Sequence, residues 1–154
     1  MFGRATDEWE TPQAFFDALD AEFGFDLDTA AKPSNAKTNR YLSDLDGALS
    51  VDWFDYIIGE AQPTCWLNPP YSKVQQFIAK AAWEARKGCT VVCLVPSRTD
   101  TRWWHEHIWD SEKHQPRPGV EIRFVKGRLK FGEGKNSAPF PSVVVIFRPV
   151  TQCS

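Results

Sequence analysis

The chain has 154 residues and a net charge of −2 at neutral pH, a length that suits one domain with a sizeable core, because a second full domain would leave both halves small. No apolar run approaches the length of a membrane-spanning helix, and residues 1–9 have neither the basic start nor the apolar core of a signal peptide. We therefore expect a single domain over residues 1–154 and a cytoplasmic location.

The two halves of the chain carry opposite net charges. Residues 1–75 sum to −8 and residues 76–154 to +6. Lys and Arg in the second half are suited to contact phosphate groups, whereas the acidic first half suits a cationic ligand. We expect two binding partners of opposite charge. The alternative, which charge alone leaves open, is a soluble protein whose charge separation serves no partner.

The cysteines and histidines form no recognised metal-ligand spacing. Three cysteines lie in predicted strands and the fourth in the tail, without a CxxC pair, so reduced packing thiols are expected. The three histidines, all between residues 105 and 114, have no nearby cysteine or carboxylate that completes a ligand set. We therefore expect no metal.

The N-terminal part predicts a helix over residues 13–19 and a strand over residues 23–28. Thr11 is placed to cap the helix and Pro12 to occupy its first position. In the strand, apolar residues alternate with Gly and Asp, and the run ends at Asp28. A carboxylate at this position, followed by small residues, could bind the amino group of a ligand or offset the charge of a sulfonium group. The alternative is an exposed aspartate at the end of a strand, without a ligand.

The middle of the chain predicts a strand, a helix and a second strand. Residues 64–67 are a short apolar run, and residues 90–95 are the nearly continuous apolar run that is typical of a strand buried on both faces. Between them, residues 73–87 have helical spacing, with a capping-box pattern at Ser72 and Gln75. Together these segments predict a βαβ unit.

The loop after the first of these strands has the sequence Asn68-Pro69-Pro70-Tyr71. An amide oxygen can accept a hydrogen bond from an exocyclic amino group, a proline-fixed turn can add a backbone carbonyl, and a tyrosine ring can stack on a planar group. Two such acceptors draw a planar nitrogen toward tetrahedral geometry and make its lone pair available. The loop therefore predicts an amino-methylation site, with an ordinary Pro-Pro turn as the alternative. Ligands in open sheets bind beyond the carboxyl ends of the strands, where both Asn68 and Pro96 are expected to lie. We therefore expect both residues to face the same ligand-binding crevice.

Several stretches together resemble the phage-type DNA N6-adenine methyltransferases, the Dam-like phage family. The resemblance extends over nearly the whole chain. It implies a compact, single-domain, Rossmann-like methyltransferase fold of the α/β class, with a mixed, mostly parallel sheet and flanking helices. It also implies S-adenosylmethionine as the methyl donor and adenine N6 in double-stranded DNA as the acceptor. The stretches are Trp9-Glu10-Thr11-Pro12, Phe25-Asp26-Leu27-Asp28-Thr29-Ala30-Ala31, Asn68-Pro69-Pro70-Tyr71-Ser72, Leu94-Val95-Pro96-Ser97-Arg98-Thr99-Asp100-Thr101 and Gly127-Arg128-Leu129-Lys130-Phe131.

By this resemblance, Asn68 and the Pro69 carbonyl would hold the adenine amino group, with Pro70 in the same motif and Tyr71 stacked on the base. The glycine-rich turn that is usual in the wider class of methyltransferases is replaced here by residues 28–31. The cofactor pocket would be lined by Trp9, Thr11, Pro12, Asp28, Ala30, Asp46 and Asn68.

Candidate DNA contacts lie in the basic C-terminal half. Paired tryptophans could wedge into a duplex or stack on an orphan base, since a base must leave the stack to reach the cofactor. The helical spacing of residues 101–109 instead favours core packing for at least one of them. The candidates are Arg98, Arg102, Trp103, Trp104, Arg128, Lys130 and Lys135, with Arg123 and Lys126 beside them.

Two other readings remain open at this point. The same tetrapeptide is similar to that of methyltransferases that act on guanine N2 in RNA or on glutamine amides in proteins. A DNA-binding protein that keeps the fold without catalysis is the second alternative. For a phage-encoded protein, the expected location is the cytoplasm of the bacterial host, and neither the DNA site nor the oligomeric state follows from the sequence.

Overall fold

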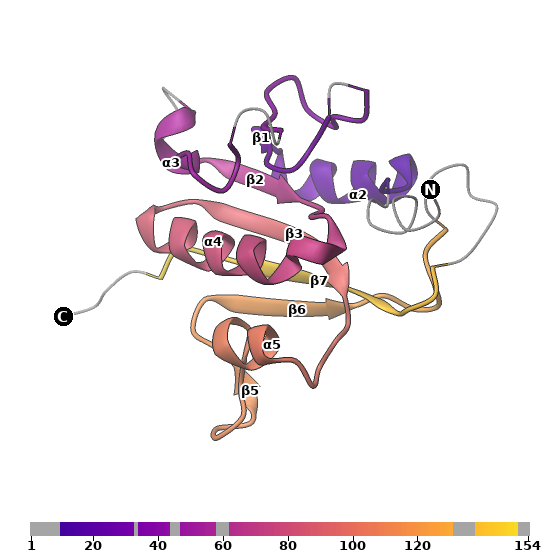
Figure 1. The fold of residues 1–154 in the computed structure, drawn as a ribbon, viewed down its shortest axis with the longest axis vertical. Coiled ribbons are helices and arrows are strands. Elements are labelled where there is room, and N and C mark those ends of the chain that lie inside the picture. Colours follow the sequence, from indigo (N-terminus) through magenta and orange to yellow (C-terminus); the bar gives the residue numbers. More distant parts are fainter. Residues whose placement is uncertain (1–9, 33, 44–46, 58–61, 131–137, 151–154) are drawn as a thin grey trace.

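The computed structural model describes residues 10–32, 34–43, 47–57, 62–130 and 138–150 (Figure 1). In this part of the chain, the main sheet has the strand order β1-β2-β3-β7-β6. Its strands are β1 (Leu27–Asp28), β2 (Thr64–Leu67), β3 (Thr90–Pro96), β7 (Ser142–Phe147) and β6 (Val120–Phe124), and a small separate sheet pairs β4 (Trp109–Asp110) with β5 (Gln115–Pro116). The helices are α2 (Gln13–Phe23), α3 (Trp53–Tyr56), α4 (Val74–Lys87) and α5 (Arg102–His107), and a 3-10 turn, η1 (Tyr71–Lys73), precedes α4.

Most strands of the main sheet run in one direction. β1, β2 and β3 pair in parallel, so that Cys65 lies opposite Leu27 on one side and Val91 on the other. β7 is antiparallel to both β3 and β6, and β6 therefore has the direction of β3 (Figure 1). The carboxyl ends of β1, β2, β3 and β6 meet at one edge of the sheet, which we call the carboxyl edge. The prediction of an α/β domain with a mixed, mostly parallel sheet is confirmed.

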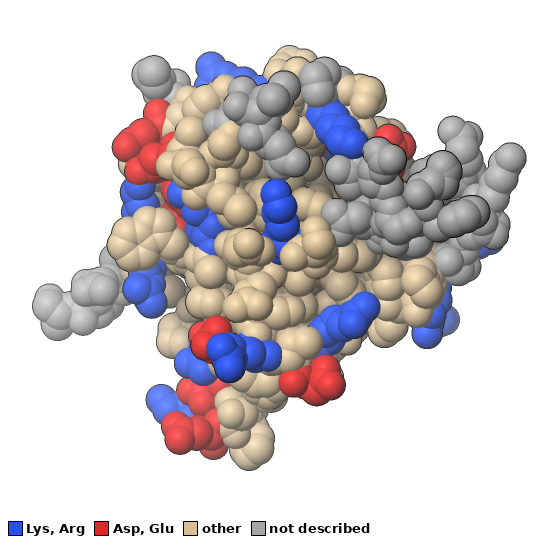
Figure 2. Space-filling view, in the orientation of Figure 1, with Lys and Arg blue, Asp and Glu red and all other residues tan. Residues whose placement is uncertain are grey.

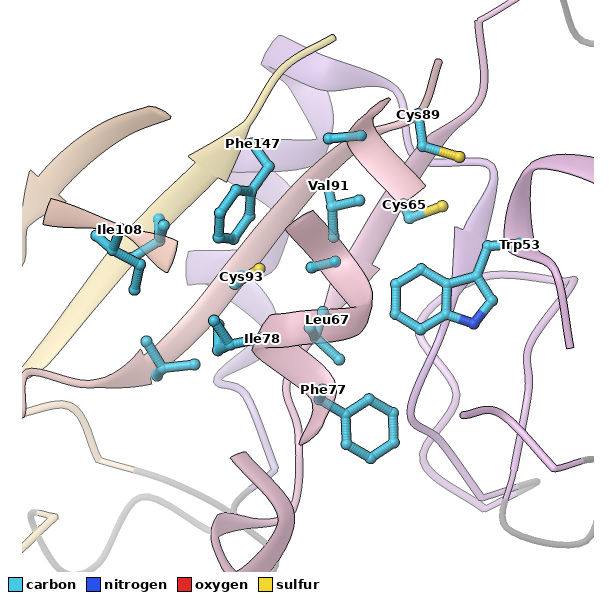
Figure 3. Close-up of a cluster of buried hydrophobic side chains, with 14 of the residues drawn as sticks. Trp53, Cys65, Leu67, Phe77, Ile78, Cys89, Val91, Cys93, Ile108 and Phe147 are labelled. Carbon is cyan, nitrogen blue, oxygen red and sulfur yellow. The ribbon is translucent and has the colours of Figure 1, made fainter. Parts of the chain in front are cut away.

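Helices cover both faces of the sheet and enclose a separate core on each. On one face, Phe77 and Ile78 of α4 belong to a cluster with Cys93 of β3, which also includes residues of α3 and α5 (Figure 3). On the other face, Phe16 of α2 packs over Trp66 of β2. Successive side chains of a strand point to opposite faces, so the continuous apolar run of β3 supplies both cores.

The predicted βαβ unit is present, with a different start for its helix. α4 begins at Val74 with Lys73 as its N-cap residue, and the chain enters it through η1 rather than through the predicted capping box. Gly88 ends the helix at a φ of 128°. A Cβ atom at Gly88 would lie 2.7 Å from the ring of Phe54, so both the backbone conformation and the close contact require glycine.

The predicted strand over residues 23–28 is largely wrong. α2 continues to Phe23, the chain turns at Gly24 with a φ of 66°, and β1 contains only Leu27 and Asp28. The alternation that suggested a strand has another cause, because Phe23 and Phe25 stack with ring centroids 6.0 Å apart. Both rings pack against the core beneath α2, one from the helix and one from the turn after it.

A buried carboxylate holds the segment between β1 and β2 against α4. The Glu84 side chain is fully buried and accepts hydrogen bonds from the backbone N–H groups of Trp53 (3.1 Å) and Phe54 (3.0 Å). Lys80 pairs with the same carboxylate at 2.9 Å. The Trp53 indole N–H donates to the Ala48 carbonyl at 2.8 Å, which fixes the loop that reaches the carboxyl edge.

Candidate functional site

Asn68 follows the last residue of β2 and therefore lies at the carboxyl edge of the sheet. Pro69 is buried, whereas Pro70 and Tyr71 are half-buried. Pro70 has extended backbone torsions, and its carbonyl accepts a hydrogen bond from the Lys73 N–H at 3.0 Å as η1 begins. The two prolines thus carry the chain from β2 into η1 along a fixed path.

The amide nitrogen of Asn68 donates a hydrogen bond to the Thr11 hydroxyl oxygen at 2.9 Å. Thr11 is buried and precedes α2, where Pro12 is the N-cap residue and the helix begins at Gln13. The predicted Thr11 cap is therefore displaced by one residue, and the Thr11 hydroxyl contacts Asn68 instead. We call residues 68–71, the predicted amino-methylation site, the acceptor loop. The bond directs the amide oxygen of Asn68 away from Thr11.

A pocket at the carboxyl edge includes Asn68 in its wall, and we call it the Asn68 pocket. It encloses about 520 Å³ of empty space including its open mouth, so a ligand seated in it would stay partly exposed. It brings together three predicted site residues, Ala30, Asn68 and Pro70. Its lining residues are Glu10, Ala30, Ala31, Lys32, Asn35, Ser43, Ala48, Asn68, Pro70 and Phe77.

Most of the polar lining was missed by the sequence analysis. Glu10 and Lys32 bring opposite charges to the wall, and Asn35 and Ser43 add polar side chains. Their position directly before α2 or in the loop after β1 was a usable signal, because such loops line the ligand crevice of open sheets. The backbone N–H of Lys32 donates to the Asn35 side chain at 2.7 Å, which fixes the turn between them.

Asp28 is buried, so the alternative of an exposed strand-end aspartate is wrong. Its carboxylate accepts hydrogen bonds from the backbone N–H groups of Ala30 (3.3 Å) and Lys37 (3.0 Å). Burial raises the pKa of Asp28 to about 6, against the opposing effect of these N–H groups and of the Lys37 charge. The carboxylate thus holds the loop that supplies Ala30 and Lys32 to the pocket wall, and Asp28 is not among the lining residues.

The Tyr71 ring packs edge-on against Phe140, with ring centroids 4.8 Å apart and an interplanar angle of 76°. Burial raises the pKa of Tyr71, and the positive charge of Arg98 opposes this shift. The hydroxyl therefore stays protonated at neutral pH. Phe140 was not predicted, because it lies far along the chain in the segment before β7 and carries no recognised motif.

Three loops converge beside this aromatic pair. The acceptor loop follows β2, the loop with Arg98 follows β3, and the segment from Ala138 to Pro141 leads into β7. The Ser97 N–H donates to the Pro141 carbonyl at 2.9 Å, and an N–H of the Arg128 guanidinium donates to the Ala138 carbonyl at 3.3 Å. The structure therefore places Arg98 and Arg128 in segments that are hydrogen-bonded to the segment that carries Phe140, the ring partner of Tyr71.

The predicted DNA contacts divide into exposed and engaged groups. Arg98, Arg102, Arg128 and Lys130 are exposed. Arg123 instead makes two hydrogen bonds of 2.7 Å to the Glu22 carboxylate and so joins β6 to α2. On the face in Figure 2, Lys and Arg side chains are spread from one end to the other, without one continuous basic patch.

The tryptophan pair must be reassigned from the DNA surface to the core. Trp103 is 6% exposed and Trp104 is 3% exposed, and both belong to the cluster beneath α4 and α5. Their rings contact each other at a centroid distance of 6.0 Å. A wedge needs an exposed ring, so the helical spacing gave the better prediction.

Some predicted residues lie outside the described part of the chain, namely Trp9, Asp46 and Lys135. Among the described residues, His, Cys, Asp and Glu side chains form no group of three or more that could hold a metal ion. The helices of the described ranges are all too short or too polar to cross a bilayer.

Comparison with known proteins adds independent findings. A family model described as DNA N-6-adenine-methyltransferase (Dam) matches residues 3–154. A DNA N-6-adenine-methyltransferase of Haemophilus phage HP1 (strain HP1c1) is 27% identical over 146 residues, which cover 93% of this chain and 79% of the relative. A DNA N-6-adenine-methyltransferase of Escherichia phage T1 is 31% identical over an alignment of 162 positions, which covers 95% of this chain and 64% of the relative. The putative methyltransferase YfdM of Escherichia coli (strain K12) is 36% identical over 66 residues, or 42% of this chain. No solved structure matches the chain.

Proposed function

The chain belongs to the DNA N-6-adenine-methyltransferase (Dam) family, and from this premise we propose that it transfers a methyl group from S-adenosylmethionine to adenine N6 in double-stranded DNA. Membership of this family makes the chain an adenine-specific DNA methyltransferase. The main support for this methyl donor and this acceptor atom is the position of Asn68. Its side chain lines a pocket at the carboxyl edge and is oriented by the hydroxyl of Thr11.

The acceptor site in this proposal is the Asn68 to Tyr71 loop. The Asn68 Oδ1 atom and the Pro69 carbonyl would each accept a hydrogen from the N6 amino group, which draws the nitrogen toward tetrahedral geometry and frees its lone pair. The Tyr71 ring would stack on the base. The bond from Asn68 to Thr11 holds the amide before the base arrives, so less ordering is needed in the transition state.

The Asn68 pocket fits S-adenosylmethionine in chemistry and in place. Ala30, Ala31 and Ala48 are small, so a ligand can approach the backbone closely. Glu10 and Lys32 carry the charges that would pair with the ammonium and carboxylate groups of the methionine end. The cofactor would supply an electrophilic methyl group on a sulfonium sulfur. Asp28 would contribute by holding the loop that carries Ala30 and Lys32.

The sheet supports a Rossmann-like methyltransferase fold. Its parallel strands β1, β2 and β3 end at the carboxyl edge, and the Asn68 pocket lies beyond β1 and β2, where ligands of open α/β sheets bind. Helices on both faces complete the arrangement.

A duplex substrate requires the target adenine to leave the base stack, because its amino group is otherwise enclosed by the duplex. Exposed arginines in the segments around the acceptor loop, Arg98 and Arg128, suit phosphate contacts that would hold the DNA during this step. The phage origin of two relatives supports action in the cytoplasm of the bacterial host.

The test is the transfer of labelled methyl from S-adenosylmethionine to unmethylated DNA, followed by nucleoside analysis. We expect the label in N6-methyladenine. Asn68→Ala should abolish transfer while weakening cofactor affinity, measured by calorimetry, only slightly, because Asn68 is one of ten residues that line the pocket. The same change at exposed Asn39 should leave both intact. Label that appears only with RNA or protein acceptors would favour the other amino methyltransferases. Absence of cofactor binding would favour a silent DNA-binding protein.

A further inference from the structure

A second pocket lies beside β6, the edge strand opposite β1 in the strand order, and has no part in the proposed function. Its lining is mainly apolar and aromatic, and it shares no residue with the Asn68 pocket. It lies between α5, the loop before α5 and β6. We call it the Phe124 groove, and its lining residues are Thr99, Trp104, His105, Trp109, Ile122 and Phe124.

Phe124 is unusual because a large aromatic side chain stands almost free in solvent. It is 74% exposed, although Ile122 of the same strand is packed against the core. Single exposed aromatic side chains are common, and Phe124 differs from them because it adjoins an apolar groove and extends the apolar surface of that groove to solvent. His105 helps to shape the groove, because its Nε2 atom lies 2.7 Å from the Thr99 carbonyl oxygen.

Two residues of the groove lie at the same edge of the sheet as the acceptor loop. Phe124 is the last residue of β6, and Thr99 lies in the loop that follows β3. These two strands run in one direction (Figure 1), so both groove residues lie at the carboxyl edge, where Asn68 follows β2.

The charge around the groove suits a polyanion. Lys126, Arg128 and Lys130 follow Phe124, all three are exposed, and no acidic residue lies between positions 122 and 130. Arg98 precedes Thr99 and is also exposed, with Asp100 as the acidic neighbour on its other side. Acidic residues adjoin three other lining residues, namely Glu106, Asp110 and Glu121, and Glu121 is paired with Arg123 and Arg148. An aromatic surface with cationic side chains in the segment that follows it combines the two features of single-stranded nucleic-acid sites.

We propose that the Phe124 groove is a second nucleobase site, which takes an unstacked base of the bound DNA on the ring of Phe124. When an enzyme flips one base out of a duplex, the adjacent bases lose a stacking contact and the opposite base loses its pairing partner. An aromatic ring on which one of these bases can stack offsets part of that cost. The proposal rests on the DNA substrate of the proposed function, and its test does not depend on methylation.

The probe is a short oligothymidylate, which contains no adenine and cannot be methylated at N6. Affinity is measured by the quenching of tryptophan fluorescence, because Trp104 and Trp109 line the groove. Phe124→Ala should weaken the affinity for oligothymidylate about tenfold, which is the effect expected when one base loses its stacking contact with one aromatic side chain. Trp83→Ala is the matched control, since Trp83 lies on α4 and is 55% exposed away from the groove.

The proposal is overturned by three results. They are a lack of oligothymidylate binding by the wild-type protein, an unchanged affinity in Phe124→Ala, and an equal loss in Trp83→Ala. A change in sedimentation of the protein alone in Phe124→Ala would show that a second copy of the chain occupies the groove. Methylation of adenine can succeed or fail independently of each of these, so the two proposals are tested separately.

Discussion

The Asn68 amide nitrogen and the Thr11 hydroxyl oxygen are 2.9 Å apart, which joins the acceptor loop to a residue 57 positions earlier in the chain. Thr11 is 4% exposed, so water competes little for this hydrogen bond. The sequence analysis placed Thr11 in the cofactor pocket. Its observed hydrogen bond instead predicts that Thr11 positions Asn68.

Replacement of Thr11 by valine removes the hydroxyl at nearly constant shape. We expect kcat to fall about fivefold, as for the loss of a partly buried hydrogen bond of roughly 1 kcal/mol, with little change in the Kd of S-adenosylmethionine. Thr11→Ser keeps the hydroxyl and should restore most of kcat. A Kd that rises in Thr11→Val while kcat stays constant would instead make Thr11 a cofactor contact.

The edge-on contact between Tyr71 and Phe140 predicts that Phe140 orients the stacking ring. Such aromatic pairs contribute about 0.5–1.5 kcal/mol beyond their buried area, so Phe140→Leu should lower kcat/KM for DNA several-fold. Phe140→Tyr keeps a ring and should be close to wild type. Melting temperatures of both variants separate a loss of orientation from a loss of stability. Equal activity of the leucine and tyrosine variants would remove Phe140 from the site.

Exposed and ion-paired arginines should behave differently toward DNA. Arg98→Gln should make the dependence of DNA affinity on salt less steep by about one unit in a double-logarithmic plot, as for the loss of one phosphate contact. Arg123 is engaged with Glu22 and Glu121, so Arg123→Gln should leave this slope unchanged and lower thermal stability. A smaller slope in Arg123→Gln would show that DNA displaces the Glu22 carboxylate.

Local patterns predicted the middle of the fold well. The apolar spacing of residues 74–87, the glycine at position 88 and the continuous apolar run of β3 each depend on near neighbours in sequence, and each was found as expected. The strand at residues 23–28 failed because two phenylalanines from different elements produced an alternating pattern by tertiary packing.

The site was predicted only where a motif named it. Asn68 and Ala30 could be placed from short stretches and from the rule for carboxyl ends of strands. The contact to Thr11 and the packing of Phe140 join segments far apart in the chain, and no local pattern marks such contacts. Exposure likewise follows from the whole fold, which is why Trp104 was proposed as a DNA contact and Phe124 was not.

The raised pKa of Asp28 predicts how stability depends on pH. Burial raises the pKa from the usual 3.8 to about 6 in the folded protein. Between these values the folded state keeps a proton that the unfolded state loses, so the free energy of unfolding decreases as pH rises. Above pH 6 the buried carboxylate costs on the order of 3 kcal/mol relative to a pH below 3.8.

Asp28→Asn removes this titration, although it also disturbs the hydrogen bond from Lys37. The useful quantity is therefore the variant's free energy of unfolding minus that of the wild type, measured by denaturant titration from pH 4 to pH 7. We expect this difference to increase with pH. The backbone N–H of Lys113 lowers the carboxyl pKa of Asp110 below its usual 3.8, so Asp110→Asn should give the opposite slope, in a window near and below pH 4 to which its titration is extended. A difference that stays constant for Asp28→Asn would mean that Asp28 is ionised in the fold at pH 4, and that its hydrogen bonds to the loop outweigh its burial.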